Sequence, residues 1–403
     1  MTLPDYLAVQ KASVYKAGEL AGSLSRRDDS TVSFAYLPEY SGDPVATSLP
    51  LGVAPVETAA GALPPFFAGL LPEGRRLTAL RAAVKTSLDD ELSLLLAVGE
   101  EVIGDVQVLP ADASPGASTA APAPTLELAP NEVSFAELFE RAVGLGLEDR
   151  AALPGVQNKV SGQMITLPVA DRHAAWILKL NPPEFPALVE NEAFFLEAAR
   201  ASGLEVAESK LIRDKDEQPG LLVRRFDRAA QPDGSLRRVA QEDACQVLGR
   251  YPSDKYRMTT EDVIRALAHT TSAPIVAARA LLQQFAFAYL SCNGDAHGKN
   301  LSILKLQGEW RVSPAYDLPS SYPYGDLTMA LSIGKKRQED IGRADFIRLG
   351  ETCGVPAKAT ERVLDRLLAS APNWIDRLEE LPYPPQATRK LAKACKYRAG
   401  RLG

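Results

Sequence analysis

Residues 109–130 divide the 403-residue chain into a short first part and a longer second part. This stretch consists almost wholly of Pro, Ala, Ser, Thr and Gly with a few acidic residues. Because such a composition cannot bury an apolar face, the stretch is predicted to be a linker or an exposed loop. A chain of this length also exceeds the size at which a single core usually keeps growing. We therefore expect one domain in residues 1–108 and a larger unit after the linker.

Residues 1–108 carry the pattern of a small α+β domain. β-type residues alternate in residues 14–24 and 32–37 and are interrupted by glycine-containing turns, which predicts hairpin strands. An apolar stretch covers residues 63–71, and a leucine-rich run covers residues 88–98. Both are predicted to be helical, with Ser87 as the N-cap of the second helix.

The sequence after the linker first predicts a helix over residues 132–147 and then a turn between β-prone segments at residues 153–162. Gly155 and Gly162 in this turn would let backbone N–H groups approach a nucleotide phosphate. Two glycines at this spacing fit an ordinary hairpin turn equally well. The segment is therefore either a phosphate-covering loop or a simple turn.

A short apolar strand is predicted at residues 176–180, and a helix follows at residues 186–201. The strand carries Lys179, and the helix carries Glu190 and Glu192. A strand lysine followed by a helix glutamate is the arrangement that places a cation on nucleotide phosphates in kinases. A lysine that merely points to solvent is the alternative interpretation.

Residues 221–228 form a β-prone segment that ends in charged residues, and Asp233-Gly234 marks a hairpin turn after it. This segment suits a hinge between two lobes or, equally, a sheet edge with solvated arginines. Helical patterns follow at residues 261–267 and 274–292. The carboxyl half of the chain is therefore predicted to be a helical lobe.

The segment from Asn293 to Asn300 has the residue types and order of a phosphoryl-transfer centre when it is taken together with Asp317. Transfer of a γ-phosphoryl group depends mainly on positioning and charge neutralisation, with one carboxylate near the nucleophile and oxygen ligands for a metal. Asp295 would face the acceptor hydroxyl, and Asn300 and Asp317 would hold magnesium. Lys299 is a candidate to stabilise charge on the migrating phosphoryl group.

Composition argues against several other classes of protein. The net charge of -6 disfavours a broad nucleic-acid-binding surface. The four cysteines are far apart in the sequence, so neither a zinc site nor a disulfide framework is indicated. The N-terminus lacks the pattern of a secretory signal, and no apolar run reaches about 18 residues. We expect a cytoplasmic protein that does not contact a membrane.

These motifs together resemble the HipA-like serine/threonine kinases, the toxins of bacterial type II toxin–antitoxin systems. The resemblance runs nearly from end to end of the chain, through short separated segments in the family's order. These segments are residues 66–74, 154–159, 177–179, 191–192, 225–228, 241–243, 245–246, 255–256, 293–300 and 314–317.

The resemblance implies an α+β, two-lobed protein-kinase-like fold with a small α+β N-terminal subdomain that contributes to antitoxin docking. Residues 131–235 would form the nucleotide-binding N-lobe portion, and residues 236–403 would form the helical C-lobe with the catalytic loop. ATP and Mg²⁺ would be the cofactors, with Asp295 and Lys299 as catalytic residues and Asn300 and Asp317 as metal ligands.

A nucleotide-binding set is implied in the same way. Lys179 would bind the ATP phosphates, and the segment around Phe226 and Asp227 would act as the hinge that holds adenine. The imidazole of His297 is expected to brace the catalytic loop beside the nucleotide. The full set implied by the resemblance is Gly155, Val156, Gln157, Asn158, Lys159, Lys179, Arg224, Phe226, Asp227, His297, Asn300 and Asp317.

The resemblance also implies the partners. A HipB-like helix-turn-helix antitoxin would neutralise the kinase and would provide its only, indirect, connection to DNA. The substrate would be a protein, with an aminoacyl-tRNA ligase as the expected target, so that translation and growth are inhibited. A small-molecule phosphotransferase remains an alternative because such enzymes share an Asp-x-x-x-x-Asn catalytic loop, but they lack the N-terminal domain. A non-catalytic, operon-regulating module is the other alternative, and the intact Asp295, Asn300, Asp317 and Lys179 argue against it.

Two positions depart from the family pattern. Well-studied members carry a serine three residues before the glycine of the phosphate loop, where phosphorylation switches the kinase off, and this chain has Ala152 there. An alanine cannot accept a phosphoryl group, so this form of self-inhibition has no acceptor at that position. Ser161 is the nearest serine downstream. Arg224 stands where many relatives have glutamate, a change that a hinge acting through backbone atoms should tolerate.

Overall fold

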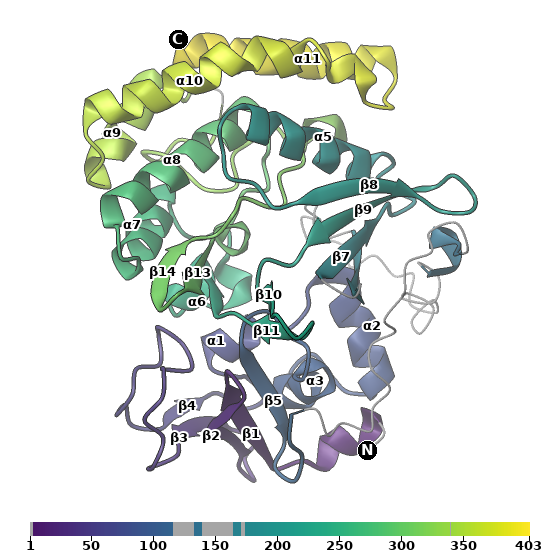
Figure 1. Cartoon of the computed structure of the whole chain (residues 1–403), viewed down its shortest axis with the longest axis vertical. Helices are drawn as coiled ribbons and strands as arrows, with labels where there is room; N and C mark the ends of the chain where they lie inside the picture. Colours follow the sequence, from purple (N-terminus) through teal and green to yellow (C-terminus); the bar gives the residue numbers. More distant parts are fainter. Residues whose placement is uncertain (1–2, 116–132, 139–163, 171–173, 339) are drawn as a thin grey trace.

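The computed structural model describes residues 3–115, 133–138, 164–170, 174–338 and 340–403 (Figure 1). A mixed N-terminal unit lies at one end of the long axis, a sheet with one helix and a group of helices lie above it, and two long helices close the other end. This mixture of helix and sheet confirms the predicted α+β class. The predicted linker lies largely outside the described residues, as does most of the helix expected over residues 132–147.

The N-terminal unit is built on an antiparallel sheet with the strand order β4-β3-β2-β1-β5. Its strands are β1 (Lys11–Lys16), β2 (Glu19–Arg26), β3 (Val32–Tyr36), β4 (Val56–Thr58) and β5 (Val106–Pro110). β1 pairs with β2 and β2 with β3, which confirms the predicted hairpins. Ala12, Val14 and Phe34 are buried while their neighbours along the strands are half-buried or exposed, so one sheet face covers a core.

Three helices accompany this sheet: α1 (Pro65–Ala68), α2 (Gly74–Val84) and α3 (Glu91–Val98). α3 begins later than the sequence predicts, and Ser87 is not its N-cap. Asp90 is the cap, since its carboxylate accepts a hydrogen bond from the backbone N–H of Ser93. Arg26 of β2 also binds Asp90, with a distance of 2.6 Å between the Nη2 and Oδ1 atoms. This contact between distant parts of the sequence fixes where the helix starts.

The middle of the molecule is a second antiparallel sheet, with the order β6-β7-β9-β8, against which α5 packs. Its elements are β6 (Ile165–Ala170), β7 (Ala175–Leu180), β8 (Ser209–Arg213), β9 (Pro219–Arg224) and α5 (Leu188–Ala201). β7 confirms the strand predicted around Lys179. Leu178 and Leu180 pack with Phe135 in a small core on one face of this sheet. Because side chains alternate along a strand, Lys179 lies on the opposite face, where it reaches α5.

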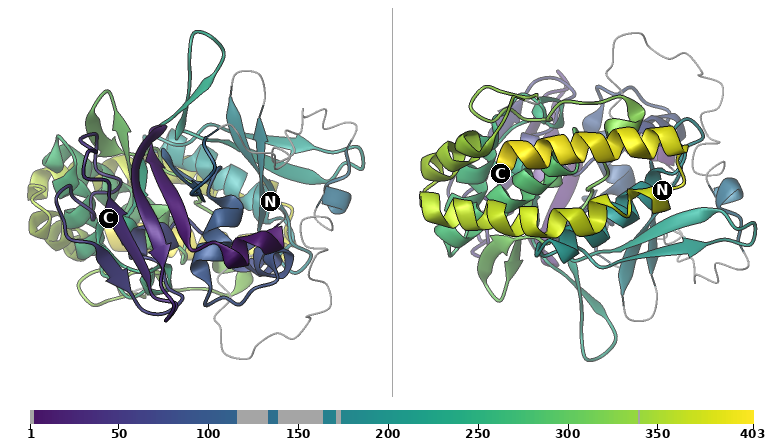
Figure 2. Two further views of the ribbon diagram at one scale, coloured as in Figure 1. Left: turned by 90° about the horizontal axis from the view of Figure 1, so that it is seen from below. Right: turned by 90° about the horizontal axis from the view of Figure 1, so that it is seen from above.

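The remaining residues form a helical part. Its helices are α6 (Ala244–Val247), α7 (Thr260–Thr270), α8 (Pro274–Leu290), α9 (Arg343–Thr352), α10 (Ala357–Ile375) and α11 (Pro385–Leu402). α7 and α8 correspond to the two helices predicted from the sequence. α8 is central, and its Phe285, Phe287 and Tyr289 are fully buried. α10 and α11 lie side by side across the end of the molecule (Figure 2, right).

Short elements complete the described fold. β12 (Gln241–Asp243), β13 (Ser302–Leu306) and β14 (Glu309–Val312) form a small sheet, and β10 (Arg228–Ala230) and β11 (Leu236–Arg238) form a hairpin. Gly234, with a φ of 86°, turns that hairpin as predicted. The described 3₁₀ helices are η1 (Leu3–Ala8), which has six residues, and the single-turn η4 (Pro252–Asp254), η5 (Gly298–Asn300), η6 (Tyr322–Tyr324) and η7 (Leu378–Glu380).

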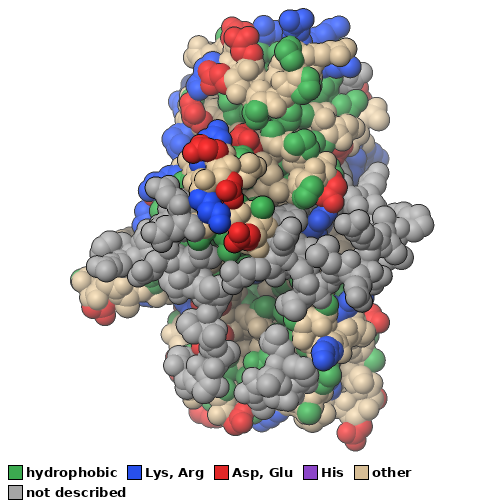
Figure 3. Space-filling view, turned by 90° about the vertical axis from the view of Figure 1, so that its right-hand side faces the viewer, with side chains coloured by type: hydrophobic (Ala, Val, Ile, Leu, Met, Phe, Trp, Pro, Cys, Tyr) green, Lys and Arg blue, Asp and Glu red, His purple; other side chains and the backbone are tan. Residues whose placement is uncertain are grey.

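The four cysteines are free thiols. Within the described ranges, no helix combines the length and the apolar character needed to span a bilayer. Basic and acidic side chains are interspersed among the described residues of the face seen in Figure 3.

Candidate active site

The catalytic loop, residues 293–300, connects the end of α8 to β13 and is buried along almost its whole length. Cys292 has a φ of 57°, which turns the chain out of the helix. The amide oxygen Oδ1 of Asn293 accepts a hydrogen bond from the backbone N–H of Asp295 at 2.9 Å. A Cβ on Gly294 would lie 2.5 Å from the carbonyl oxygen of Thr328, so only glycine fits there. The loop therefore has one packed conformation that presents Asp295.

Tyr256 contacts the predicted catalytic carboxylate directly. Its hydroxyl donates a hydrogen bond to Oδ1 of Asp295 at 2.7 Å. Its ring meets the imidazole of His297 edge to face, with 5.0 Å between the centroids. Burial and the neighbouring Asp295 raise the pKa of Tyr256 well above its usual value, so the hydroxyl stays protonated and donates. Sequence reasoning placed Tyr256 in a family motif without giving it a role.

Lys179, Glu192 and Asp317 form a buried ionic cluster beside the loop. Nζ of Lys179 lies 2.6 Å and 2.8 Å from the two carboxylate oxygens of Glu192 and 3.1 Å from Oδ1 of Asp317. Asp317 adopts a left-handed backbone conformation with a φ of 57°, which is uncommon outside glycine. The predicted lysine–glutamate arrangement is therefore present, and the solvent-facing alternative for Lys179 is wrong because its side chain is buried.

Burial alone would lower the pKa of Lys179, but the carboxylates of Asp317 and Glu192 outweigh this effect and raise it. The lysine is therefore a permanent cation. Burial raises the pKa of Glu192 despite the opposing effect of Lys179. Lys179 therefore stays protonated between two carboxylates, as a nucleotide-binding lysine of a kinase does.

Asn300 and Asp317, the two predicted metal ligands, lie in contact. The amide nitrogen of Asn300 donates a hydrogen bond to Oδ2 of Asp317 at 2.5 Å, and its Oδ1 accepts one from the backbone N–H of His297 at 3.1 Å. Both residues can offer oxygen atoms, the ligands that Mg²⁺ prefers, and Mg²⁺ typically takes one or two carboxylates from protein and the rest from phosphates and water. The donor set thus fits a magnesium ion bound together with a nucleotide.

Asn191 of α5 ties the segment after Asp317 to this site. It is fully buried, its Nδ2 donates to the carbonyl oxygen of Ser320, and its Oδ1 accepts from the backbone N–H of Ser320 at 2.8 Å. Since Glu192 is the next residue along α5, one helix positions both the partner of Lys179 and the chain that follows Asp317. The sequence signal was the adjacent pair Asn191-Glu192, whose function in positioning was not predicted.

Lys299 has contacts that differ from its predicted role. Its Nζ donates to the carbonyl oxygen of Gly69 at 2.9 Å and lies 3.7 Å from Oδ2 of Asp243. Gly69 belongs to the N-terminal unit, so Lys299 connects that unit to the catalytic loop. His297 lies within the loop and packs against Tyr256, in keeping with a bracing role.

The predicted hinge residues separate into different environments. Arg224 is exposed and pairs with Glu208 at 2.9 Å. The ring of Phe226 lies 5.6 Å from that of Tyr316, the neighbour of Asp317. The Asp227 carboxylate is buried, pairs with Arg225 and Arg228 at 2.7 Å and accepts from the backbone N–H of Gly104 at 2.9 Å. The Asp227 side chain thus binds the N-terminal unit, and an adenine contact by this segment would have to come from other atoms.

Five predicted nucleotide-binding residues lie outside the described part of the chain. They are Gly155, Val156, Gln157, Asn158 and Lys159. Ala152 and Ser161 lie outside it as well. Of the predicted site residues that are described, the structure brings together Lys179, Asp295, His297, Asn300 and Asp317.

A buried lysine–glutamate pair on a sheet and helix, together with a buried Asp295–Asn300 loop and Asp317 in a helical part, is the arrangement of a kinase-like protein. A family model described as the HipA-like C-terminal domain matches residues 151–375, and one described as the HipA N-terminal domain matches residues 12–109. The chain belongs to the HipA-like kinase family.

Similar proteins agree with this assignment. Y4mE of Sinorhizobium fredii, whose name gives kinase as a provisional activity, is 33% identical over 395 residues, which cover 93% of each chain. The serine/threonine-protein kinase toxin HipA of Shewanella oneidensis is 26% identical over 315 residues, covering 73% of this chain and 71% of that protein. The solved complex of Shewanella oneidensis HipA with HipB and operator DNA contains a chain of the same fold, with a TM-score of 0.76, 22% identity and coverage of 97% and 96%.

Proposed function

We propose that this chain is an ATP- and magnesium-dependent serine/threonine protein kinase that phosphorylates a protein substrate and thereby inhibits growth. The observation that carries the proposal is the convergence of Lys179, Glu192 and Asp317 with Asn300 of the catalytic loop, which also presents Asp295. Each member of this set comes from a different element, so local sequence constraints alone would not bring them together.

The residues have distinct roles in this proposal. Lys179, fixed by Glu192, would bind phosphate oxygens of ATP, and Asn300 and Asp317 would hold Mg²⁺. Bound magnesium would neutralise charge on the phosphates. Asp295 would accept a hydrogen bond from the acceptor hydroxyl and orient it in line with the γ-phosphorus, taking its proton as the new P–O bond forms. Tyr256 would keep the Asp295 carboxylate in position.

A HipB-like helix-turn-helix antitoxin is the proposed partner, because the structurally similar HipA is solved with HipB and its operator DNA. DNA would then be contacted through the antitoxin. For the substrate we propose a protein of the translation machinery, an aminoacyl-tRNA ligase, as the family resemblance implies.

The substitution Asp295→Asn tests the catalytic assignment. It keeps the size of the side chain and removes the base, so ATP-dependent phosphorylation should fall by at least about a thousandfold, with loss of growth inhibition. Phosphoproteomics after brief expression of the wild type and the variant would identify the target. Asp340→Asn, at an exposed position, is the control. Undiminished phosphorylation by Asp295→Asn, or ATP binding that does not respond to removal of magnesium, would contradict the proposal.

A further inference from the structure

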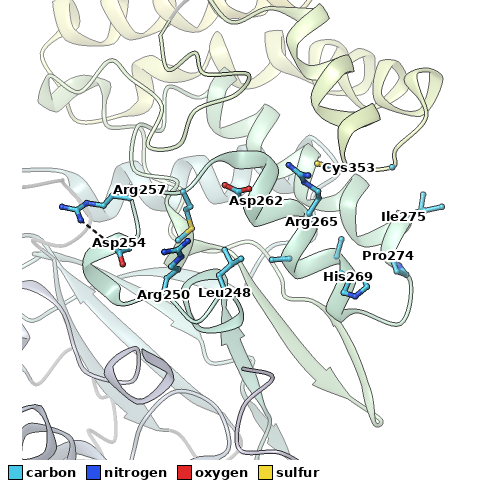
Figure 4. A pocket seen from close by; sticks show the side chains of 14 residues that line it. Leu248, Arg250, Asp254, Arg257, Asp262, Arg265, His269, Pro274, Ile275 and Cys353 are labelled. Atoms are coloured by element: carbon cyan, nitrogen blue, oxygen red, sulfur yellow. Dashed lines mark hydrogen bonds and ion pairs between the residues drawn. The ribbon is translucent and has the colours of Figure 1, made fainter. Parts of the chain in front are cut away.

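A groove opens on the helical part of the molecule (Figure 4). Its volume is about 1010 Å³, and it lies between the end of α6, the solvent side of α7 and the start of α8. We name it the α7 groove. It is large enough for several side chains of a bound polypeptide.

One end of the α7 groove reaches the catalytic loop. Met258, which lines the groove, lies against Gly298, since a Cβ on that glycine would come within 2.6 Å of the Met258 sulfur. Arg257, also in the lining, directly follows Tyr256, whose hydroxyl is bonded to Asp295. The wall of the groove therefore touches the catalytic loop at Gly298 and adjoins Tyr256 along the chain.

The groove carries more cationic than anionic groups. Arg250, Arg257 and Arg265 are exposed in its lining, together with the carboxylates of Asp254 and Asp262. Asp262 caps α7 through Thr259, and Asp254 pairs with Arg257 at 3.4 Å.

The two other guanidinium groups have free donor capacity. Arg265 donates its Nε to the carbonyl oxygen of Glu261 in its own helix. No ion pair is formed by Arg250 or Arg265 within the described residues, although both arginines, after Thr259, help to lower the pKa of Asp262. Guanidinium groups with unused donors bind carboxylates in a bidentate way.

The groove also offers apolar surface. Met258 is buried in its lining, Leu248 is half-buried, and Ile275 at the start of α8 is 61% exposed. An occupant with both acidic and apolar side chains would match this combination. The net charge of -6 means that the molecule as a whole repels acidic polypeptides. A local excess of arginine would therefore direct an acidic segment to this groove.

We propose that the α7 groove is the docking site for an acidic segment of the protein substrate that lies next to the phosphorylated serine or threonine. This inference rests on the proposed kinase function and adds the chemistry by which the substrate is recognised. The arginines would bind Asp or Glu side chains of the substrate, and Leu248 and Ile275 would contact an apolar residue between them. The groove thereby places the acceptor hydroxyl near Asp295.

A positional-scanning library of serine- and threonine-centred peptides, phosphorylated with labelled ATP, tests this proposal. The wild type should select Asp or Glu on one side of the acceptor. The triple variant Arg250→Ala/Arg257→Ala/Arg265→Ala should lose that selection, with kcat/KM for the preferred acidic peptide reduced at least about tenfold and the KM for ATP retained. Arg362→Ala/Arg366→Ala/Arg389→Ala removes three exposed arginines of α10 and α11 and should keep the wild-type selection.

Binding without catalysis gives a second measurement. The preferred peptide, with its acceptor replaced by alanine and a fluorescent label attached, should bind the wild type and lose at least about tenfold in affinity for the groove variant. Phosphorylation without acidic preference, or the same preference in both triple variants, overturns the groove assignment and leaves the kinase function standing. Failure of the wild type to phosphorylate any peptide or protein, while Asp295→Asn behaves identically, overturns the kinase function itself.

Discussion

The active site and the seam between the N-terminal unit and the rest of the chain both contain buried charges, but their charge balance differs. In the active site, the carboxylates of Glu192 and Asp317 share one lysine, Lys179, so the cluster has a net charge of -1 when all three groups are ionised. Such an excess is costly in a buried place unless a cation joins it. The magnesium ion that we propose would offset this negative charge.

At the seam the cationic groups outnumber the carboxylates, the reverse of the active site. The carboxylates of Asp227 and Glu101 bind three arginines, Arg225, Arg228 and Arg238, at 2.6–2.8 Å. Backbone groups of residues 102 and 104 bind Arg225, Arg228 and Asp227 as well. The network thus joins the N-terminal unit to the rest of the chain. The comparison indicates that some family motif residues serve the site while others attach the N-terminal unit to it.

Further contacts of the seam lead toward the site. Lys299 of the catalytic loop binds Gly69, and Lys255, the neighbour of Tyr256, binds Glu73 at 3.0 Å. A Cβ on Gly69 would come within 2.8 Å of Gln246, so a larger residue would separate the two surfaces. Attachment of the N-terminal unit and the geometry around Asp295 are thus physically connected.

The largest effect is expected for Lys179→Met, which removes the only cation of the active-site cluster. Phosphorylation should fall by at least about a thousandfold, and the free energy of unfolding should drop by about 3–5 kcal/mol because buried carboxylates lose their partner. Activity assays and chemical denaturation would measure both. Lys210→Met, on the exposed surface of β8, should change neither by much. If Lys179→Met retained its kinase activity, the Lys179 cluster would have a structural function, like the seam, and no catalytic one.

Asp227→Asn tests whether the seam can be disrupted without affecting the nucleotide site. Breaking the seam network should lower the free energy of unfolding by about 3–5 kcal/mol, since two buried arginines lose their carboxylate. The affinity for ATP, measured by calorimetry, should change by less than about threefold, because this side chain faces the N-terminal unit. A large loss of ATP affinity with little change in stability would instead support the predicted role of Asp227 in the adenine hinge. Asp216→Asn, at an exposed position, is the matched control.

The seam should also respond to acid. Burial would raise the pKa of Asp227, but Arg225 and Arg228 outweigh this effect and hold it below its usual value near 4. A carboxyl with a lowered folded-state pKa stabilises the fold above its unfolded pKa and loses that contribution as the pH falls through the folded value. The free energy of unfolding should therefore decrease below about pH 4, and less steeply in Asp227→Asn. Equal slopes for the two proteins in denaturation at several pH values would argue against this assignment.

The same comparison explains which features the sequence could predict. Local patterns predicted the β1–β2–β3 hairpins, the strand at Lys179 and helices α7 and α8, because alternation, periodicity and turn residues are short-range signals. The start of α3 was wrong because Arg26, distant in sequence, holds its true cap, Asp90. The contacts of Asp227 with Gly104 and of Lys299 with Gly69 could not be predicted, because they form only when the N-terminal unit packs against the rest of the chain. The sequence therefore predicted roles for both side chains at the nucleotide and its phosphoryl group. Residue types alone carry no signal of such a seam.

Tyr256→Phe should have the smallest effect on activity. It tests whether Tyr256 serves the active site or the seam. The change removes the hydrogen bond to Asp295 and keeps the ring that packs against His297. A hydrogen bond to a charged group contributes about 1.5–3 kcal/mol, so kcat should fall by about tenfold while the KM for ATP and the free energy of unfolding change little. The acid limb of the pH–rate profile should move to higher pH, because the hydroxyl stabilises the ionised carboxylate. If kcat and the profile match the wild type while thermal stability falls, Tyr256 belongs to the seam and not to the active site.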